Sequence, residues 1–127
     1  MDKDVIWVGG GHTYYLRWIL RACGADKIIS DLVGQGKIYA GWSAGAVVSW
    51  PSIRFFDAMG DDPKDAPEWI EEGLGLCPLV IVPHVDHPDF MGGAKITSQK
   101  LQDAGFVVCE LKDDQAFVVQ NQQQEII

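Results

Sequence analysis

Short, continuous apolar runs constrain the fold of this chain more than any other feature. Val5–Val8 and Leu79–Val82 are apolar at every position, without the alternation of a strand that has one face in water. Such runs are typical of parallel strands buried on both faces. After the first run, apolar residues recur with the helical spacing i, i+3, i+4, i+7 between residues 16 and 23. Strands that alternate with helices predict an α/β fold with a largely parallel sheet flanked by helices.

The same patterns predict the elements along the chain. We expect one domain over residues 1–127, because a chain of 127 residues has the length of a single domain. Thr13 is the expected N-cap of the first helix. The expected strands are residues 5–8, 37–40, 79–82, 106–109 and 116–119, and the expected helices are 13–23, 25–33, 44–50 and 95–104, with a short helical turn at 68–73 and loops at 51–67 and 83–93.

Charge and cysteine content exclude several classes of protein. The formal net charge is −8, whereas nucleic-acid binding relies on Lys and Arg to neutralise phosphates. We therefore expect neither nucleic acid nor an anionic membrane surface as a partner. Cys23, Cys77 and Cys109 are odd in number and form no CxxC pair, so neither a disulfide framework nor a zinc site is indicated. Without a signal-peptide pattern or an apolar run of membrane-spanning length, the expected location is the cytoplasm.

A serine turn carries the main functional signal. Gly41-Trp42-Ser43-Ala44-Gly45 fits the pattern G-x-S-x-G, with an expected strand before it and an expected helix after it. In such a nucleophile elbow, a strained turn exposes the serine hydroxyl, and the glycines avoid clashes with neighbouring backbone. The helix N-terminus behind the serine supplies N–H groups for an oxyanion. A small-residue turn that only packs tightly is the competing interpretation.

A nucleophilic serine needs a base, and His84 is the best-placed histidine. It follows the buried run Leu79–Val82 directly, so it is expected at the same sheet edge as Ser43. A metal site at His84-x-x-His87 is a weaker alternative, because no third ligand is evident. The acidic partner is open among the aspartates between Ser43 and His84, which are Asp57, Asp61, Asp62 and Asp65.

Three separated segments of the chain form a recognisable set: VGGGHTYYL, YAGWSAGAVVSWPSIR and GLGLCPLVIVPHVD. In this order, they resemble the signature segments of the peptidase E family of aspartyl dipeptidases, peptidase family S51. The resemblance implies a fold like that of the class I glutamine amidotransferases, with a serine in place of their cysteine. It implies Ser43 as nucleophile, His84 as catalytic histidine, and Gly11 with Ala44 as the oxyanion-hole donors. It implies no metal and no organic cofactor.

The chain departs from the family pattern at three points. His12 stands where the family has Asn after the glycine turn. The family's acidic residue follows the segment matched by Pro51–Arg54, and an ungapped match puts Ala58 there, so Asp57 is the chosen acid and Asp61 the next. Family members also carry a substantial N-terminal portion, with further strands and helices, before the strand that leads into the glycine turn, whereas this chain begins at that strand. The chain is therefore naturally short, or a fragment, or completed by a partner.

The resemblance implies a cytoplasmic serine dipeptidase for peptides with an N-terminal Asp. Arg54, His12 and His87 are the expected substrate-binding residues. A homodimer or larger homo-oligomer is expected, because the strand at residues 5–8 needs cover on both faces. Two other functions stay open: an inactive remnant that serves as a binding or assembly module, and a small esterase.

Overall fold

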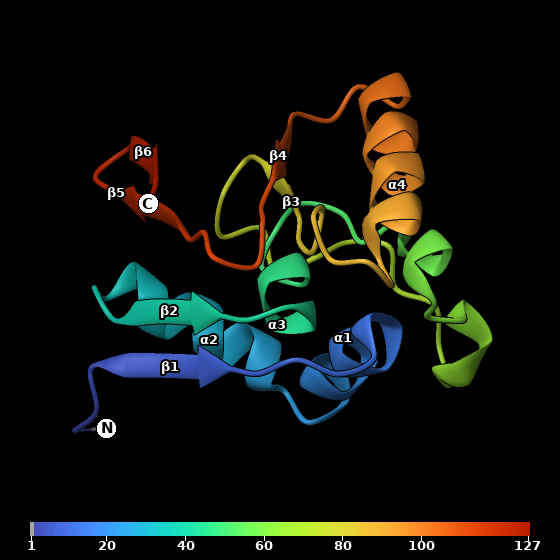
Figure 1. The fold of residues 1–127 in the computed structure, drawn as a ribbon. Helices are drawn as coiled ribbons and strands as arrows, with labels where there is room; N and C mark the ends of the chain where they lie inside the picture. The colour runs from blue at the N-terminus through green and yellow to red at the C-terminus, as the bar shows by residue number, and fades with distance from the viewer. Residues whose placement is uncertain (1) are drawn as a thin grey trace.

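The computed structural model describes residues 2–127, and its architecture is α/β, as predicted (Figure 1). Helices and strands follow one another in the expected order, with two short 3-10 helices, η1 and η2, in the predicted loop 51–67. The elements are β1 (Val5–Val8), α1 (Thr13–Ala22), α2 (Ala25–Gly34), β2 (Ile38–Gly41), α3 (Ala44–Val47), η1 (Phe56–Met59), η2 (Pro63–Asp65), β3 (Val80–Val82), α4 (Met91–Asp103), β4 (Val108–Glu110), β5 (Phe117–Gln120) and β6 (Gln123–Ile126).

The strands form pairs where we expected one largely parallel sheet. β1 pairs with β2 in parallel, with Val8 opposite Gly41, and β3 pairs with β4 in parallel, with Val82 opposite Glu110. β5 and β6 form an antiparallel hairpin. Figure 1 shows α3 between the two parallel pairs, so the segments after β1, β2 and β3 run toward the same region of the molecule.

Three local predictions were wrong. α4 begins at Met91, inside the predicted loop 83–93 and four residues before the predicted helix 95–104. Residues 68–73 form no helical turn within the described chain; Glu72 instead makes an isolated antiparallel bridge with Ser52. The N-cap of α1 is His12 and not Thr13, because the His12 side chain accepts a hydrogen bond from the Tyr15 N–H. The strand β6 was not foreseen, since its glutamine-rich sequence carries no strand signal of its own and becomes a strand by pairing with β5.

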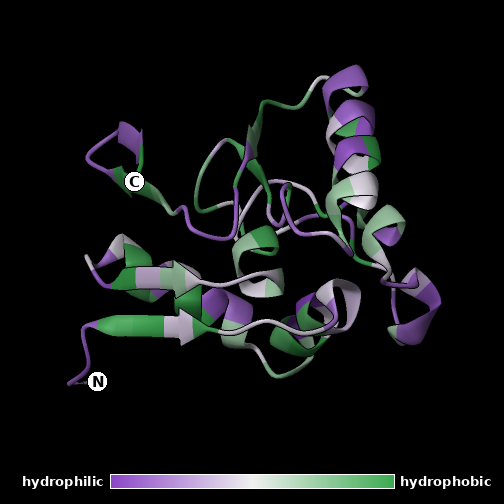
Figure 2. Ribbon diagram, in the orientation of Figure 1, coloured by the Kyte–Doolittle hydropathy of each residue, from purple (hydrophilic) through white to green (hydrophobic). Residues whose placement is uncertain are grey.

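The main core lies between α1, α3, α4 and the strands. It contains fully buried residues such as Val48, Ile53, Val82 and Leu101, and a smaller cluster surrounds Ile81 and Trp50. Figure 2 shows that β1 and β3 are largely hydrophobic, whereas α4 mixes hydrophilic and hydrophobic residues. The core therefore holds the beginning of α3 in place, directly behind the serine turn.

One face of the β1–β2 pair is exposed to solvent. Val5, Trp7 and Ile38 are exposed there, and 66% of Trp7 is accessible to solvent. The homo-oligomer predicted from this strand stays a prediction. Among residues 2–127, no helix is long and apolar enough to cross a membrane.

Candidate active site

Ser43 occupies a strained turn between β2 and α3. Its φ of 55° and ψ of −117° lie outside the regions that residues with a side chain ordinarily adopt. The flanking glycines have a steric reason: a Cβ at Gly45 would collide with the carbonyl of Val8, and a Cβ at Gly41 with the carbonyl of Gly45. The local sequence therefore forms the sharp strand-to-helix turn that projects a serine hydroxyl.

The structure brings His84 to this hydroxyl. Ser43 Oγ lies 2.9 Å from His84 Nε2, a hydrogen-bond distance. His84 comes two residues after β3, takes a positive φ of 64°, and packs its ring 5.1 Å from that of Phe90. Its side chain is only 18% exposed. The two residues thus form the nucleophile and base geometry required for covalent catalysis.

The acidic neighbour of His84 is a residue that sequence reasoning missed. Asp113 Oδ1 lies 2.6 Å from His84 Nδ1, and the Asp113 N–H donates to Asp86 Oδ1 at 3.0 Å. Ser43, His84 and Asp113 therefore form a continuous hydrogen-bonded chain. With its nitrogens next to Ser43 and Asp113, His84 is not free to hold a metal, and residues 2–127 contain no group of three potential metal ligands.

The aspartate selected from the sequence lies elsewhere. Asp57 is exposed on η1, where its backbone N–H donates to the Tyr14 hydroxyl at 2.8 Å. No hydrogen bond within the described chain links Asp57 to His84. The same holds for the other aspartates considered, since Asp61 accepts from the Thr13 N–H and Asp65 lies against His12.

A small pocket opens in front of Ser43. It has a volume of about 130 Å³, and its lining includes Gly11, Ser43, Ala44 and His84. Gly11 takes a φ of 139°, which favours glycine. Within residues 2–127, neither the Gly11 N–H nor the Ala44 N–H donates a hydrogen bond to another residue. Both donors expected for an oxyanion hole are thus unused beside the serine.

Comparison with known proteins agrees with this geometry. A family model described as peptidase family S51 matches residues 1–127. The chain belongs to peptidase family S51. The chain is 38% identical to the uncharacterized peptidase Lin0382 of Listeria innocua over 102 residues, 80% of this chain and 47% of that protein. It is 40% identical to peptidase E of Escherichia coli O1:K1 over 83 residues, 65% of this chain and 34% of that protein.

A solved structure is also similar. The crystal structure of a protein from Listeria monocytogenes EGD-e, assigned to peptidase E, matches with a TM-score of 0.84 and 28% identity. The match covers 99% of this chain and 60% of the other. The S51 chain described here thus spans about half the length, or less, of the curated relatives that it matches.

The expected substrate-binding residues of this S51 chain do not line the pocket. His12 caps α1, and its Nε2 lies 3.2 Å from Asp65 Oδ2. Arg54 pairs with Glu71 at 3.3 Å and stacks over the Phe55 ring. His87 accepts the Asp89 N–H at Nδ1, 3.1 Å away. Each of the three side chains is therefore in contact with another residue of the protein, and none of them lines the pocket in front of Ser43.

Two tyrosines, the buried Tyr14 and the half-buried Tyr39, hold the backbone of η1 and of the serine turn, respectively. The Tyr39 hydroxyl donates to the Gly45 carbonyl at 2.6 Å, and burial raises the pKa of this phenol. Burial and the nearby Asp57 charge raise the pKa of Tyr14, whose hydroxyl accepts the Asp57 N–H. Both phenols therefore stay neutral at physiological pH, and they fix the backbone around the serine turn and η1.

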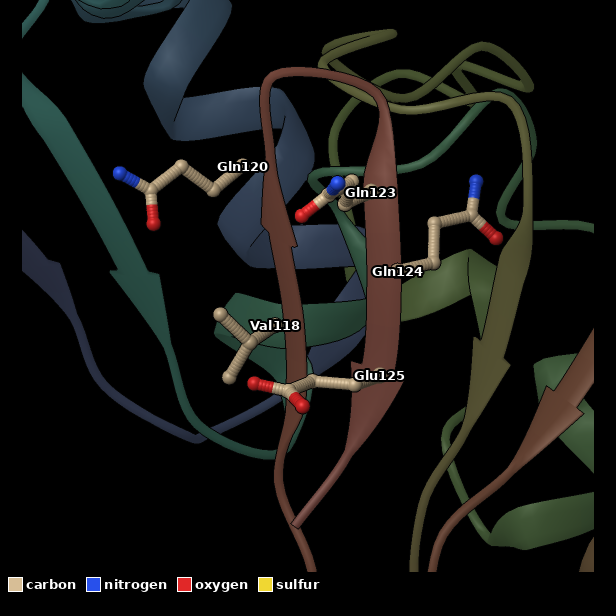
Figure 3. A pocket seen from close by; sticks show the side chains of 5 residues that line it. All are labelled: Val118, Gln120, Gln123, Gln124 and Glu125. Atoms are coloured by element: carbon tan, nitrogen blue, oxygen red, sulfur yellow. The ribbon is translucent and has the colours of Figure 1, made fainter.

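A second hollow lies at the β5–β6 hairpin, far along the chain from Ser43. Its lining consists of Val118, Gln120, Gln123, Gln124 and Glu125. Figure 3 shows Gln120 and Gln124 pointing to opposite sides of the hairpin. The lining contains no serine, cysteine or histidine, so this hollow lacks the groups that the serine turn provides.

Proposed function

We propose that this S51 chain is a serine-type peptidase that cleaves very small peptides, in particular dipeptides. One observation carries the proposal: His84 bridges Ser43, 2.9 Å away, and Asp113, 2.6 Å away. A base between a nucleophile and an orienting carboxylate is the arrangement that activates a serine hydroxyl. The peptidase names of the relatives support the same reaction class.

In the proposed mechanism, Ser43 Oγ attacks the carbonyl carbon of the peptide bond while His84 Nε2 takes the hydroxyl proton. The Asp113 carboxylate accepts the hydrogen bond from Nδ1–H, which holds the ring in the required tautomer and stabilises the imidazolium. The N–H groups of Gly11 and Ala44 bind the oxyanion of the tetrahedral intermediate. Collapse breaks the C–N bond, and His84 gives its proton to the leaving amine. Water then hydrolyses the acyl-enzyme by the same steps.

Backbone strain argues against an inactive remnant. Ser43 and His84 are non-glycine residues that both have positive φ. Such conformations cost about 1–3 kcal/mol each, and they persist mainly where function uses them. Phe55, Asn121 and Gln122 also have positive φ, but Ser43 and His84 in addition lie within hydrogen-bond distance of each other, and this combination favours a functional site.

The pocket also supports a small substrate. Its volume of about 130 Å³ lies below the roughly 300–1,000 Å³ of pockets for drug-sized ligands. A substrate of one or two residues is consistent with this size. The preference for an N-terminal Asp that the family resemblance implies stays a prediction, as does the cytoplasmic location.

The proposal is tested with a panel of dipeptides that differ in their first residue. Released amino acid is quantified by mass spectrometry for the purified chain and for Ser43→Ala. We expect release by the parent chain and none by the variant. If the folded chain released no amino acid from any dipeptide or tripeptide, the peptidase assignment would be wrong for this chain.

A further inference from the structure

His12 joins the glycine turn beside Ser43 to the first helix. A Cβ at Gly10 would lie 3.3 Å from the Ser43 Cβ, so the backbone of this turn lies directly against the serine. Gly11 comes next, lines the pocket and carries one of the N–H groups expected for the oxyanion hole. His12 follows it immediately and is the N-cap of α1. The position of the Gly11 N–H therefore depends on how His12 is held.

The His12 side chain holds the start of α1 by a hydrogen bond that needs an unprotonated ring nitrogen. Nδ1 accepts the Tyr15 N–H at 3.2 Å, and the His12 carbonyl accepts the Leu16 N–H at 2.9 Å. A neutral imidazole has one accepting nitrogen, whereas an imidazolium has two donors and no acceptor. The cap therefore requires the neutral ring, with its proton on Nε2.

Carboxylates beside the ring attract its charged form. Asp65 on η2 places Oδ2 3.2 Å from His12 Nε2, and Asp61, just before η2, accepts the Thr13 N–H. Tyr14 is a third titratable neighbour, with its ring centroid 6.0 Å from that of His12, and this phenol stays neutral. An imidazolium would be drawn to the carboxylates, but its charge would lie at the positive end of α1 and its Nδ1–H would face another donor. The ring therefore cannot hold a second proton and cap the helix at the same time.

We propose that His12 is a positioning residue for the oxyanion hole, and that a second proton on its ring weakens the hole. The inference rests on the proposed function, because it concerns the same serine turn. The neutral ring caps α1 and fixes the backbone at Gly11. The charged ring releases the Tyr15 N–H, and the glycine turn is then free to move away from Ser43. Since imidazole side chains titrate between about pH 5 and 8, mild acid should slow the reaction for a reason separate from protonation of His84.

The experiment measures the rate of Ser43 labelling by a fluorophosphonate, and kcat/KM for a dipeptide, between about pH 5 and 8. Protonation of the base His84 contributes one proton to the acid limb in every variant. His12→Asn retains a side-chain oxygen that caps a helix but does not titrate, and His12→Ala removes the cap. His87→Asn is the matched control, because His87 Nδ1 also accepts a backbone N–H, from Asp89 at 3.1 Å, and does not line the pocket.

In the parent chain, we expect the logarithm of the labelling rate to fall with a slope of about two at the acid end, and in His12→Asn with a slope of about one. His87→Asn should retain the parent slope. At pH 8, His12→Asn should label within about threefold of the parent. His12→Ala should label about tenfold more slowly, which is part of the roughly 10²–10³-fold effect of a lost oxyanion donor. The hydrogen-exchange protection factor of the Tyr15 amide should fall on acidification in the parent and not in His12→Asn.

A slope of about one in both the parent and His12→Asn, or a Tyr15 protection factor that does not change with pH, would overturn the role of His12 and leave the proposed function intact. A slope of about two that persists in His12→Asn, or that His87→Asn removes, would assign the second proton to another group and would also overturn this role. If the folded chain showed neither Ser43 labelling nor dipeptide hydrolysis at any pH, both this inference and the proposed function would be wrong.

Discussion

Replacing Asp113 by Asn tests the part of the site that the sequence did not reveal. The substitution preserves the size of the side chain and removes its charge. An amide can also present its NH₂ group to His84 Nδ1, which favours the wrong tautomer of the imidazole. We expect a lower kcat, a nearly unchanged KM and unchanged stability, because the interaction strengthens when His84 becomes charged during the reaction.

The geometry sets the size of the effect. In a well-buried triad, this exchange lowers kcat by about 10⁴-fold. The Asp113 side chain is 43% exposed, so water screens its charge. Between the dielectric of water and an effective value of about 20, two charges about 4 Å apart interact by about 1–4 kcal/mol. At about 1.4 kcal/mol per factor of ten, and with the tautomer effect added, we expect a loss of about 10²–10³-fold.

The assay is steady-state hydrolysis of the best dipeptide found, with two controls. Asp114→Asn changes the neighbouring exposed carboxylate, and Asp57→Asn changes the aspartate that the sequence favoured. Both should retain activity within about threefold, since charges that do not contact the reacting groups have small effects. Loss of kcat in Asp57→Asn with full activity in Asp113→Asn would refute the placement of Asp113 beside His84.

Three further predictions concern the catalytic base His84, the serine turn at Gly45 and the solvent-exposed face of β1. His84→Ala should lower kcat by about 10³-fold or more, whereas His87→Ala should stay within about tenfold; equal losses would point to a misassigned base. Gly45→Ala should lower the free energy of unfolding by about 1–3 kcal/mol in chemical denaturation, because its Cβ meets the Val8 carbonyl. Gly34→Ala is the matched control, since a Cβ there meets nothing within 4 Å, and equal stability of both variants would contradict the steric argument. Sedimentation should show an oligomer that Trp7→Lys dissociates, and a monomer at every micromolar concentration tested would contradict self-association through this face.

The sequence was most informative where one strand and the turn after it decide the position of a residue. Ser43 and His84 each come two residues after a strand, a typical position for site residues in α/β proteins, although β2 and β3 belong to separate strand pairs here. The need for glycine at position 41 is also local, because a Cβ there would meet the Gly45 carbonyl, whereas Gly45 is required by its close approach to the Val8 carbonyl of β1. Ser43, His84 and Gly41 were therefore predictable without knowledge of the tertiary structure.

The sequence did not indicate Asp113, because the acid was expected between Ser43 and His84 along the chain and Asp113 follows both. The parallel pairing of Val82 with Glu110 brings the turns after β3 and β4 together, so that residues 84 and 113 meet across 29 positions. The aspartate-containing turn at residues 112–114 was visible in the sequence, but its pairing register was not.

The most direct test of the central claim is covalent labelling of the serine. The folded chain is treated with a fluorophosphonate probe, and the modified residue is identified by peptide mass spectrometry. We predict one adduct, on Ser43, which is absent in Ser43→Ala and strongly slowed in His84→Ala. A well-folded chain that forms no adduct, or that carries it on another serine, would contradict the assignment of Ser43 as an activated nucleophile.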